Sequence, residues 1–304
     1  METLDLDVVT CICNHLDTKY IIRFSSISKR YGQILYKHLF QGIFHINKIK
    51  NLPYFDQFAK VIVSDVADGL PKNVTHLLFD SATPINQPLP NTIVYILFHH
   101  HFNHPIDRVL PSSLITVDFG IDFNQRIENC IPGSVVTCRF GSRFNQPIKG
   151  CIPRSVTHLQ FRRDFNQPIE NAIPDSVTHL TFGSHFNQTI CGCIPLSVTH
   201  LEFGMYRNQL FEKDIPASVT HLTVGFTFVA SKIPKTVTHL TFDTFFNQRI
   251  ERCIPSSITH LTFGYAFHRP ITDVPPSVVV ISVNKCCKSV IADHLLTKVV
   301  RYSI

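Results

Sequence analysis

The sequence predicts an α+β protein in which a small N-terminal helical domain precedes a parallel β-solenoid with one strand per coil. Three observations support this prediction. A proline recurs about every 21 residues, and the same run of β-branched and aromatic residues follows it. The first 40 residues lack the repeat but space their apolar residues as short amphipathic helices do. We assign residues 1–40 to the helical domain, 41–69 to a bridging N-terminal cap, 70–283 to eleven solenoid units and 284–304 to a C-terminal cap.

The register of the repeat is set by its prolines. They are Pro71, Pro90, Pro111, Pro132, Pro153, Pro174, Pro195, Pro216, Pro234, Pro255 and Pro275. The successive steps are 19 residues, 21 residues six times, and then 18, 21 and 20 residues. Such a period is typical of a solenoid, because one coil cannot bury its own apolar face and must stack on its neighbours.

Each position after the proline has one physical role. A Ser or Thr two residues on offers a hydroxyl to the turn in ten units, and a Phe lies eight residues on in nine units. The run V-T-H-L-x-F predicts one strand per unit, with Leu159 and Phe161 pointing inward and His158 and Gln160 pointing outward. No 3.6-residue apolar period lies between the strands, so we expect no helix on the back of a coil.

An asparagine follows the strand Phe by five residues in seven units. These residues are Asn103, Asn124, Asn145, Asn166, Asn187, Asn208 and Asn247. An amide is both donor and acceptor, so the column is expected to satisfy turn backbone groups in its own coil and the next, with ligand binding as the alternative. Val229 takes this position in the 18-residue unit, where we expect a tightened or distorted coil.

A histidine lies five residues after the proline in seven units: His76, His158, His179, His200, His221, His239 and His260. These imidazoles should form a ladder that is structural, binds a partner, or does both. A metal site is disfavoured because a straight ladder does not converge on one ion. Two protonated imidazoles ~4.8 Å apart would repel by about 3.5 kcal/mol at an effective dielectric constant near 20, so we expect a neutral ladder at pH 7.

The outward position two residues after the histidine varies freely, which is how a uniform repeat can encode the choice of a partner. The residues expected to contact a partner are His158, Gln160, His179, Thr181, His200, Glu202, His221, Thr223, His239, Thr241 and His260.

The repeated pattern F-N-Q-P-I-x-x-x-I-P-x-S-V-T-H-L-x-F-G closely resembles the FNIP repeat, a branch of the leucine-rich-repeat class described mainly from amoebae and the giant viruses that infect them. The resemblance covers residues 70–283. It implies a leucine-rich-repeat-like interaction surface without catalysis.

The N-terminal run L-D-L-D-V-V-T-C-I-C-N-H-L, followed by I-I-R-F-S-S-I-S-K-R-Y, looks like an F-box, with a plain helical cap as the alternative. Asp5 stands where that family usually has proline, and Tyr31 replaces its usual tryptophan. The resemblance implies docking on a Skp-type adaptor of a cullin–RING ubiquitin ligase. The adaptor-binding residues would be Leu4, Val8, Val9, Ile12, Leu16, Ile21, Ile22, Phe24 and Ile27.

Together the two resemblances predict the substrate-recognition subunit of a Skp–cullin–F-box ubiquitin ligase, whose repeat sheet holds a substrate protein. The alternative is a repeat scaffold without a ubiquitin link. An enzyme is not expected, because the chain contains no G-x-S-x-G, P-loop, H-E-x-x-H or paired C-x-x-C motif. Scattered arginines such as Arg162 and Arg163 are weak support for nucleic-acid binding.

The composition favours a monomeric cytoplasmic protein, in the host cytoplasm if the source is viral. The net charge of +6 is spread along the chain, no signal peptide begins it, and no run of about 20 apolar residues predicts a membrane span. Four of the ten cysteines, Cys130, Cys151, Cys193 and Cys253, share one repeat position and are expected to be buried, reduced thiols. No metal or cofactor is expected.

Overall fold

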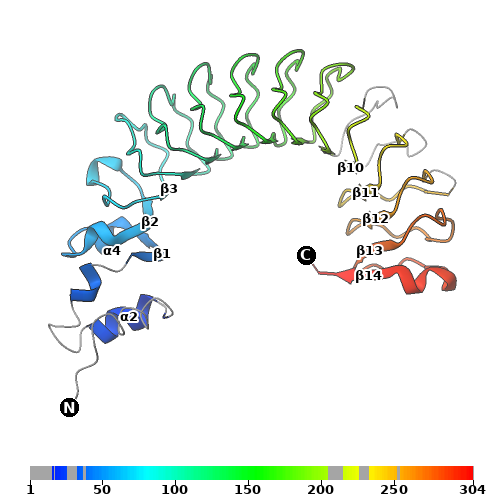
Figure 1. Ribbon diagram of the computed structural model, residues 1–304, viewed down its shortest axis with the longest axis horizontal. Coiled ribbons are helices and arrows are strands. Elements are labelled where there is room, and N and C mark those ends of the chain that lie inside the picture. Colours follow the sequence, from blue (N-terminus) through cyan, green and yellow to red (C-terminus); the bar gives the residue numbers. More distant parts are fainter. Residues whose placement is uncertain are drawn as a thin grey trace.

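The computed structural model describes residue 16 and residues 18–25, 33–36, 39–204, 215–225, 233–251 and 254–303. The chain forms an arc of stacked coils whose strands line its inner side and whose connecting loops lie outside (Figure 1). In the described residues fourteen strands form one sheet in chain order, and each neighbouring pair is parallel. The predicted β-solenoid is therefore confirmed.

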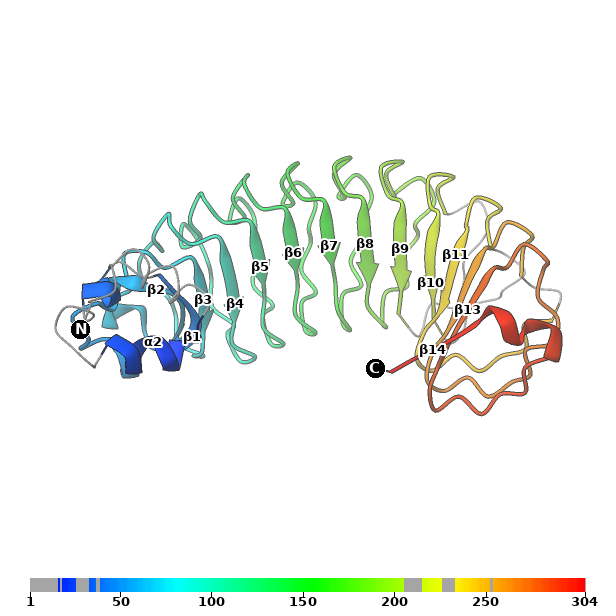
Figure 2. The same ribbon diagram turned by 60° about the horizontal axis from the view of Figure 1, so that its bottom comes forward.

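Eleven of these strands belong to the eleven proline units. They are β3 (His76–Phe79), β4 (Tyr95–Phe98), β5 (Thr116–Asp118), β6 (Thr137–Arg139), β7 (His158–Gln160), β8 (His179–Phe182), β9 (His200–Phe203), β10 (His221–Val224), β11 (His239–Phe242), β12 (His260–Phe263) and β13 (Val280–Asn284). They lie side by side in Figure 2. Between β3 and β13 no described residue is helical, as the sequence predicts.

The sheet continues beyond the proline units at both ends. Strands β1 (Phe40–His45) and β2 (Phe58–Val63) precede β3, and β14 (Val299–Tyr302) pairs with β13. Short helices accompany them: α4 (Ile46–Ile49), η2 (Phe55–Gln57), η3 (Val66–Asp68) and η6 (Asp293–Lys298). The segment assigned to the C-terminal cap thus contains a 3₁₀ helix and the last strand of the sheet.

Two helical segments are described before β1, namely α2 (Thr18–Ser25) and η1 (Gln33–Tyr36). Ile21 and Ile34 are fully buried and belong to the same apolar cluster as the solenoid interior. The described part of the N-terminal region therefore packs against the first end of the solenoid.

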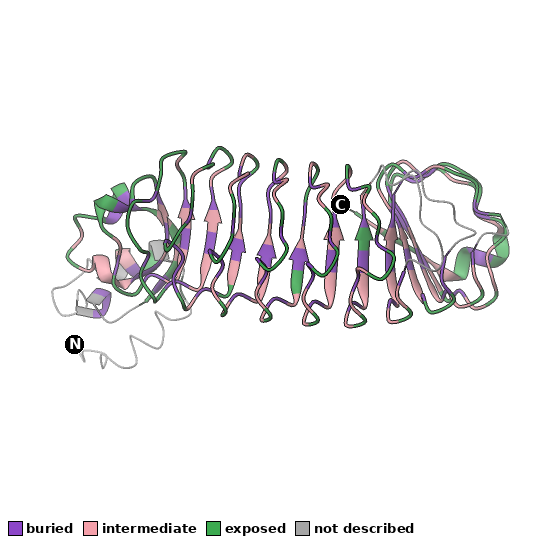
Figure 3. Ribbon diagram, turned by 90° about the horizontal axis from the view of Figure 1, so that it is seen from above, coloured by how far each residue is buried: buried purple, intermediate pink, exposed green. Residues whose placement is uncertain are grey.

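Buried and partly exposed residues alternate along the strands (Figure 3). In the coil of β7, Leu159 and Phe161 are buried while His158 and Gln160 face outward, which confirms the predicted orientation. The interior contains two columns of phenylalanine, one at the end of each strand and one four residues later. Within a coil the two rings stack closely, as in the Phe161–Phe165 pair at a centroid distance of 3.9 Å.

The separation of neighbouring coils differs between the two sides of the sheet. Rings of the outward histidine column lie 4.0–4.2 Å apart. Phenylalanines at the strand ends lie 5.3–6.0 Å apart between β5 and β9, and those of the second column lie 6.0–6.3 Å apart from Phe102 to Phe186. Each coil is therefore a wedge with its thin side toward the histidines, and stacked wedges produce the arc.

Two ladders of polar side chains join the coils. The Asn145 Oδ1 atom accepts from the backbone N–H of Asn166 at 2.9 Å and from Gln167 Nε2 at 3.0 Å, which confirms the expected bond to the next coil. The Ser155 Oγ atom donates to the carbonyl of Val135 in the preceding coil at 2.7 Å. Equivalent bonds are made by Ser113, Ser134, Ser176, Ser197 and Ser218, so these serines bond between coils rather than within their own turns. The Oγ atoms of Ser257 and Ser277 are buried without a hydrogen-bond partner in the described part of the chain. Asn208 and Val229 lie outside the described residues.

Candidate functional site

Two columns of outward side chains form the surface that we call the inner face. The first column runs along the sheet through Lys60, His76, Tyr95, Thr116, Thr137, His158, His179, His200, His221, His239, His260 and Val280. The second runs through Ile62, Leu78, Leu97, Asp118, Arg139, Gln160, Thr181, Glu202, Thr223, Thr241, Thr262 and Ser282. All eleven predicted partner-contacting residues lie on this face, and the strand pairing brings them together in register.

Six histidines of the first column form an unbroken stack. The centroid distance is 4.2 Å from His158 to His179 and 4.0 Å from His200 to His221, and the stack extends to His260. The seventh histidine, His76, stands apart and stacks on Tyr95 at 5.4 Å. Tyr95, Thr116 and Thr137 lie between His76 and His158 in the column, so the histidine ladder is interrupted over three coils.

Each ladder histidine is held by the threonine that precedes it. The Thr Oγ1 atom lies 2.8–2.9 Å from the imidazole Nδ1 atom in all seven cases. The same hydroxyl lies farther, at 3.2–3.5 Å, from a carbonyl oxygen of the preceding coil. That carbonyl also accepts backbone donors: the Thr157 oxygen, for example, accepts the N–H groups of Thr178 and His179.

The hydroxyl donates to this carbonyl oxygen and also lies within hydrogen-bond distance of Nδ1, so it bridges the backbone and the ring. This contact orients each ring and leaves its Nε2 atom at the far end. The stack therefore presents a row of Nε2 atoms, each of which can form a hydrogen bond with a partner.

The surroundings favour the neutral form of five of these imidazoles. Burial lowers the pKa of His76, His179, His221 and His239, and it lowers the pKa of His200 to about 4 with help from the neighbouring histidines. In the part of the chain that the structure describes, no group of three or more His, Cys, Asp or Glu side chains is arranged to hold a metal ion.

The histidine stack borders a shallow depression of about 300 Å³ over β8–β11. Its floor includes Thr181, Glu202, Thr223 and Thr241 from the second column. Thr181 Oγ1 donates to Glu202 Oε2 at 3.4 Å, and burial raises the pKa of the Glu202 carboxyl group. A carboxylate, several hydroxyls and a row of imidazoles give this end of the face a polar character.

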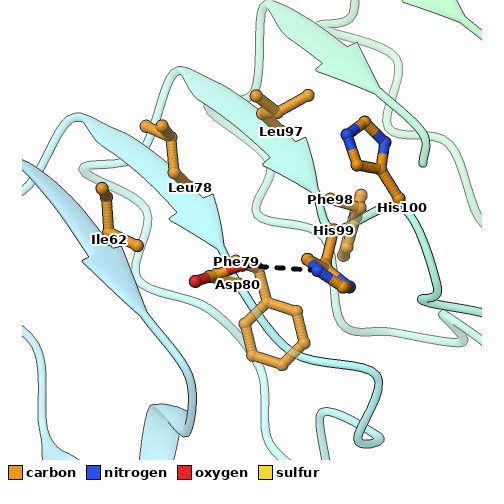
Figure 4. Close-up of a pocket in the computed structure, with 8 residues that line it drawn as sticks. All are labelled: Ile62, Leu78, Phe79, Asp80, Leu97, Phe98, His99 and His100. Carbon is orange, nitrogen blue, oxygen red and sulfur yellow. Dashed lines mark ion pairs between the residues drawn. The ribbon is translucent and has the colours of Figure 1, made fainter. Parts of the chain in front are cut away.

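The N-terminal end of the second column is apolar. Ile62, Leu78 and Leu97 project from the same side of three neighbouring strands and line a groove of about 320 Å³ with Phe79 and Phe98 (Figure 4). At its rim His99 Nε2 lies 3.5 Å from the Asp80 carboxylate. Sequence reasoning placed Leu78 and Leu97 in the variable column but did not identify the groove. The sequence feature that could have revealed the groove is the pair of leucines at a position that is mostly polar in later coils.

Charged residues follow on the next strands of the second column. Arg162 Nη2 lies 3.8 Å from Asp118 Oδ1. Burial raises the pKa of Asp118, while the charges of Arg162 and Arg139 oppose that rise. The guanidinium of Arg139 makes no hydrogen bond or ion pair within the described ranges.

The predicted adaptor-binding residues are placed only in part. Leu16 is exposed and Ile22 packs partly buried against the core. Ile21 is fully buried and belongs to the apolar cluster of the solenoid interior. The side chain of Phe24, and the residues Leu4, Val8, Val9, Ile12 and Ile27, lie outside what the structure describes.

The described cysteines are free thiols, and Cys130 and Cys151 are buried as predicted, whereas Cys193 is partly exposed. Burial raises the pKa of Cys130 to about 12, so this thiol stays protonated. Cys253 lies outside the described residues.

Among the described helices, none combines the length and apolar content that a bilayer crossing requires.

Comparisons with known proteins agree with this architecture. The family model described as "FNIP Repeat" matches six overlapping segments, at residues 123–164, 144–185, 165–206, 186–227, 227–266 and 246–286. The chain is also similar to a solved structure described as "The crystal structure of CroV588 a novel circular LRR protein structure", with 35% identity and a TM-score of 0.65. The match covers 86% of this chain and 43% of that chain, so this chain spans less than half the length of that protein. A search of curated proteins found no match.

Proposed function

The chain belongs to the FNIP repeat family and is a repeat-based protein-interaction scaffold, and on that premise we propose that it binds a partner protein on the inner face of its sheet. The observation that supports this proposal is the pair of outward columns. One column repeats the same imidazole, held in place by a threonine, while its neighbour changes from coil to coil. The chain contributes recognition and carries out no reaction.

Variants of the inner face test this proposal. A combined variant, Leu97→Asp with Glu202→Lys and Thr223→Arg, changes the charge at both ends of the inner face without touching the core. We expect a partner captured by the wild-type chain from a lysate to be lost by this variant. Arg154→Glu, an exposed substitution outside both columns, serves as the matched control. If both variants capture the partner as well as the wild type, binding lies elsewhere on the chain.

We further propose that the partner is a substrate for ubiquitin transfer. In this hypothesis residues 1–40 dock on a Skp-type adaptor in the cytoplasm, and the other subunits of the ligase carry out the chemistry. The support is the F-box-like order of residues from Leu4 to Tyr31 and the helical conformation of α2. A monomer is sufficient for this role.

Co-purification with a Skp adaptor tests the ligase hypothesis. The wild-type chain is expected to retain the adaptor, and Val8→Glu combined with Val9→Glu is expected to abolish retention. Asp5→Pro, which restores the residue usual in F-boxes, should strengthen it. Val290→Glu, an exposed apolar position near the opposite end, is the control.

A scaffold without a ubiquitin link is the second candidate. The burial of Ile21 in the solenoid core favours it, because that side chain already serves as part of an end cap. Failure of the wild-type chain to bind any Skp adaptor, with capture on the inner face intact, would decide for this candidate.

A further inference from the structure

We propose that the inner face from β2 to β6 binds an extended protein segment that carries one large apolar side chain and, about 10–14 Å away, one acidic side chain. This inference rests on the proposed function and deepens it by stating the chemistry of the partner. The contact that it assigns lies at the N-terminal end of the inner face, whereas the polar depression lies over β8–β11.

The apolar contact is the groove of Ile62, Leu78 and Leu97. These three side chains are half-buried and adjacent, whereas the second column is polar or charged from Asp118 to Ser282. A volume of about 320 Å³ lies at the small end of the range for ligand pockets, about 300–1,000 Å³. It therefore suits one large side chain, whose burial would remove the apolar row from water.

The acidic contact is the Arg139 guanidinium. Leu97, Asp118 and Arg139 are Cα partners on successive strands. With ~4.8 Å per strand, Arg139 lies about 10 Å from Leu97 and about 14 Å from Leu78. The Asp118 carboxylate already faces Arg162, so Asp118, Arg139 and Arg162 together carry one excess positive charge. A carboxylate can pair with the guanidinium of Arg139 through two parallel hydrogen bonds.

The charges near the groove are also consistent with an acidic side chain on the partner. Lys60 lies in the first column beside the groove, on the strand of Ile62. Asp80 at the rim lies 3.5 Å from His99 Nε2. The concave shape of the face admits a narrow segment that follows the arc and excludes a flat surface such as a bilayer (Figure 1).

The experiment measures fluorescence anisotropy of labelled 12-residue peptides with the full chain. The probe contains one Leu and one Glu four residues apart, which places them on one side of an extended segment about 13 Å apart. We expect saturable binding that weakens at least tenfold when the peptide Leu is changed to Ser or its Glu to Gln. Moving the Glu next to the Leu should weaken binding similarly.

Protein variants locate the contact. Leu97→Asp and Arg139→Glu are each expected to weaken binding at least tenfold, and Arg139→Glu should recover affinity for a peptide whose Glu is changed to Lys. Thr241→Arg, a second-column substitution in the polar depression, is the matched control and should change the affinity less than twofold. Thermal melts confirm folding, and Leu78→Ser replaces Leu97→Asp if the latter does not fold.

Two outcomes would overturn the inference. One is the absence of binding by every Leu–Glu peptide. The other is binding that Thr241→Arg abolishes and that Leu97→Asp and Arg139→Glu leave intact, which would place the contact at the histidine end. In either case, capture of a partner that is lost on Leu97→Asp with Glu202→Lys and Thr223→Arg would leave the proposed function standing.

Discussion

His221 and His239 are in register on neighbouring strands, and their rings stack at 4.0 Å, although their coil is three residues shorter than most. The threonines before them are 18 residues apart, compared with 21 in the preceding coils. Strand pairing and ring stacking therefore set the register of the inner face independently of the length of the connection. The distortion expected around Val229 does not reach the two strands that flank it.

Insertions should show this independence directly. Adding three residues within 226–232 restores the usual coil length, and we expect it to change the melting temperature by only a few degrees. Adding one residue between Leu180 and Thr181 should prevent folding, because it moves every later residue of β8 to the opposite face of the sheet. Circular dichroism melts compare the two. Equal destabilisation by both insertions would show that coil length does control the register.

Acid should weaken the solenoid through its histidine ladder. Burial holds the pKa values of five ladder histidines below 6.5, and that of His200 is about 4. Their full contribution is present above pH 6.5, where folded and unfolded chains are both neutral at these sites. As the pH falls from 6.5 toward 4, the unfolded chain takes up protons that the folded chain refuses, and stability is lost. Each imidazole contributes at most about 1.4 kcal/mol per pH unit, and solvent screening reduces that value.

The measurement is the melting temperature at pH 7.5 and pH 5, which we expect to be lower at pH 5. The variant His200→Thr provides the control, because threonine occupies this position naturally at Thr116 and Thr137. It should reduce the dependence on pH. Asp118 and Glu202 act in the opposite direction, since burial raises their pKa values and favours protonation in the folded chain. A melting temperature that is the same at both pH values would refute the role of the ladder.

The asparagine ladder should be sensitive to loss of its acceptor oxygen. Asn145→Ala leaves the Asn166 N–H without its partner in a partly buried position, and we expect a loss of about 1–3 kcal/mol in the free energy of unfolding. Asn145→Asp retains the acceptor oxygen for Asn166 and Gln167, so it should lose less. Urea unfolding of the two variants measures the difference. The prediction is wrong if aspartate costs as much as alanine.

In several coils a glycine follows the strand phenylalanine, at a point where the backbone of the preceding coil lies close. A Cβ atom added at Gly141 would collide with the carbonyl oxygen of Gly120 in the preceding coil. We expect Gly141→Ala to destabilise the chain by more than ~2 kcal/mol, as overpacking against backbone does. Gly133→Ala is the matched control: no atom lies within 4 Å of its added Cβ, and it should be neutral or slightly stabilising. Thermal melts that rank the two variants equally would contradict this interpretation.

The repeat made the solenoid predictable in detail. Eleven proline-aligned units, five of which carry V-T-H-L-x-F, placed His158 outward and Phe161 inward, and the structure agrees. A single copy would have been ambiguous, because a short apolar run does not distinguish a strand from a buried helix. The bond from Asn145 to the next coil was also predictable, since an amide that recurs at one coil position can reach its neighbours.

Features that depend on distances between coils were not predictable. The threonine hydroxyl that orients each imidazole also donates to a carbonyl of the preceding coil, and no sequence pattern reveals this bridge. The apolar groove includes Ile62, which lies before Pro71, the first proline of the register, and therefore outside the repeat. The burial of Ile21 depends on how α2 packs against the solenoid, which its helical spacing alone does not determine.

Because the coils are wedge-shaped, the number of coils determines whether the stack stays open or closes on itself. If each coil turns the chain by a similar angle, a sufficient number of coils brings the last strand back to the first, and the molecule has no free sheet edge. The solved relative that is described as circular has more than twice the length of the segment matched here. The arc of this chain instead presents both an outer strand at β1 and one at β14. Duplication of whole coils could therefore convert an open arc into a closed ring, and loss of coils could reverse that change, without any change in the repeat itself.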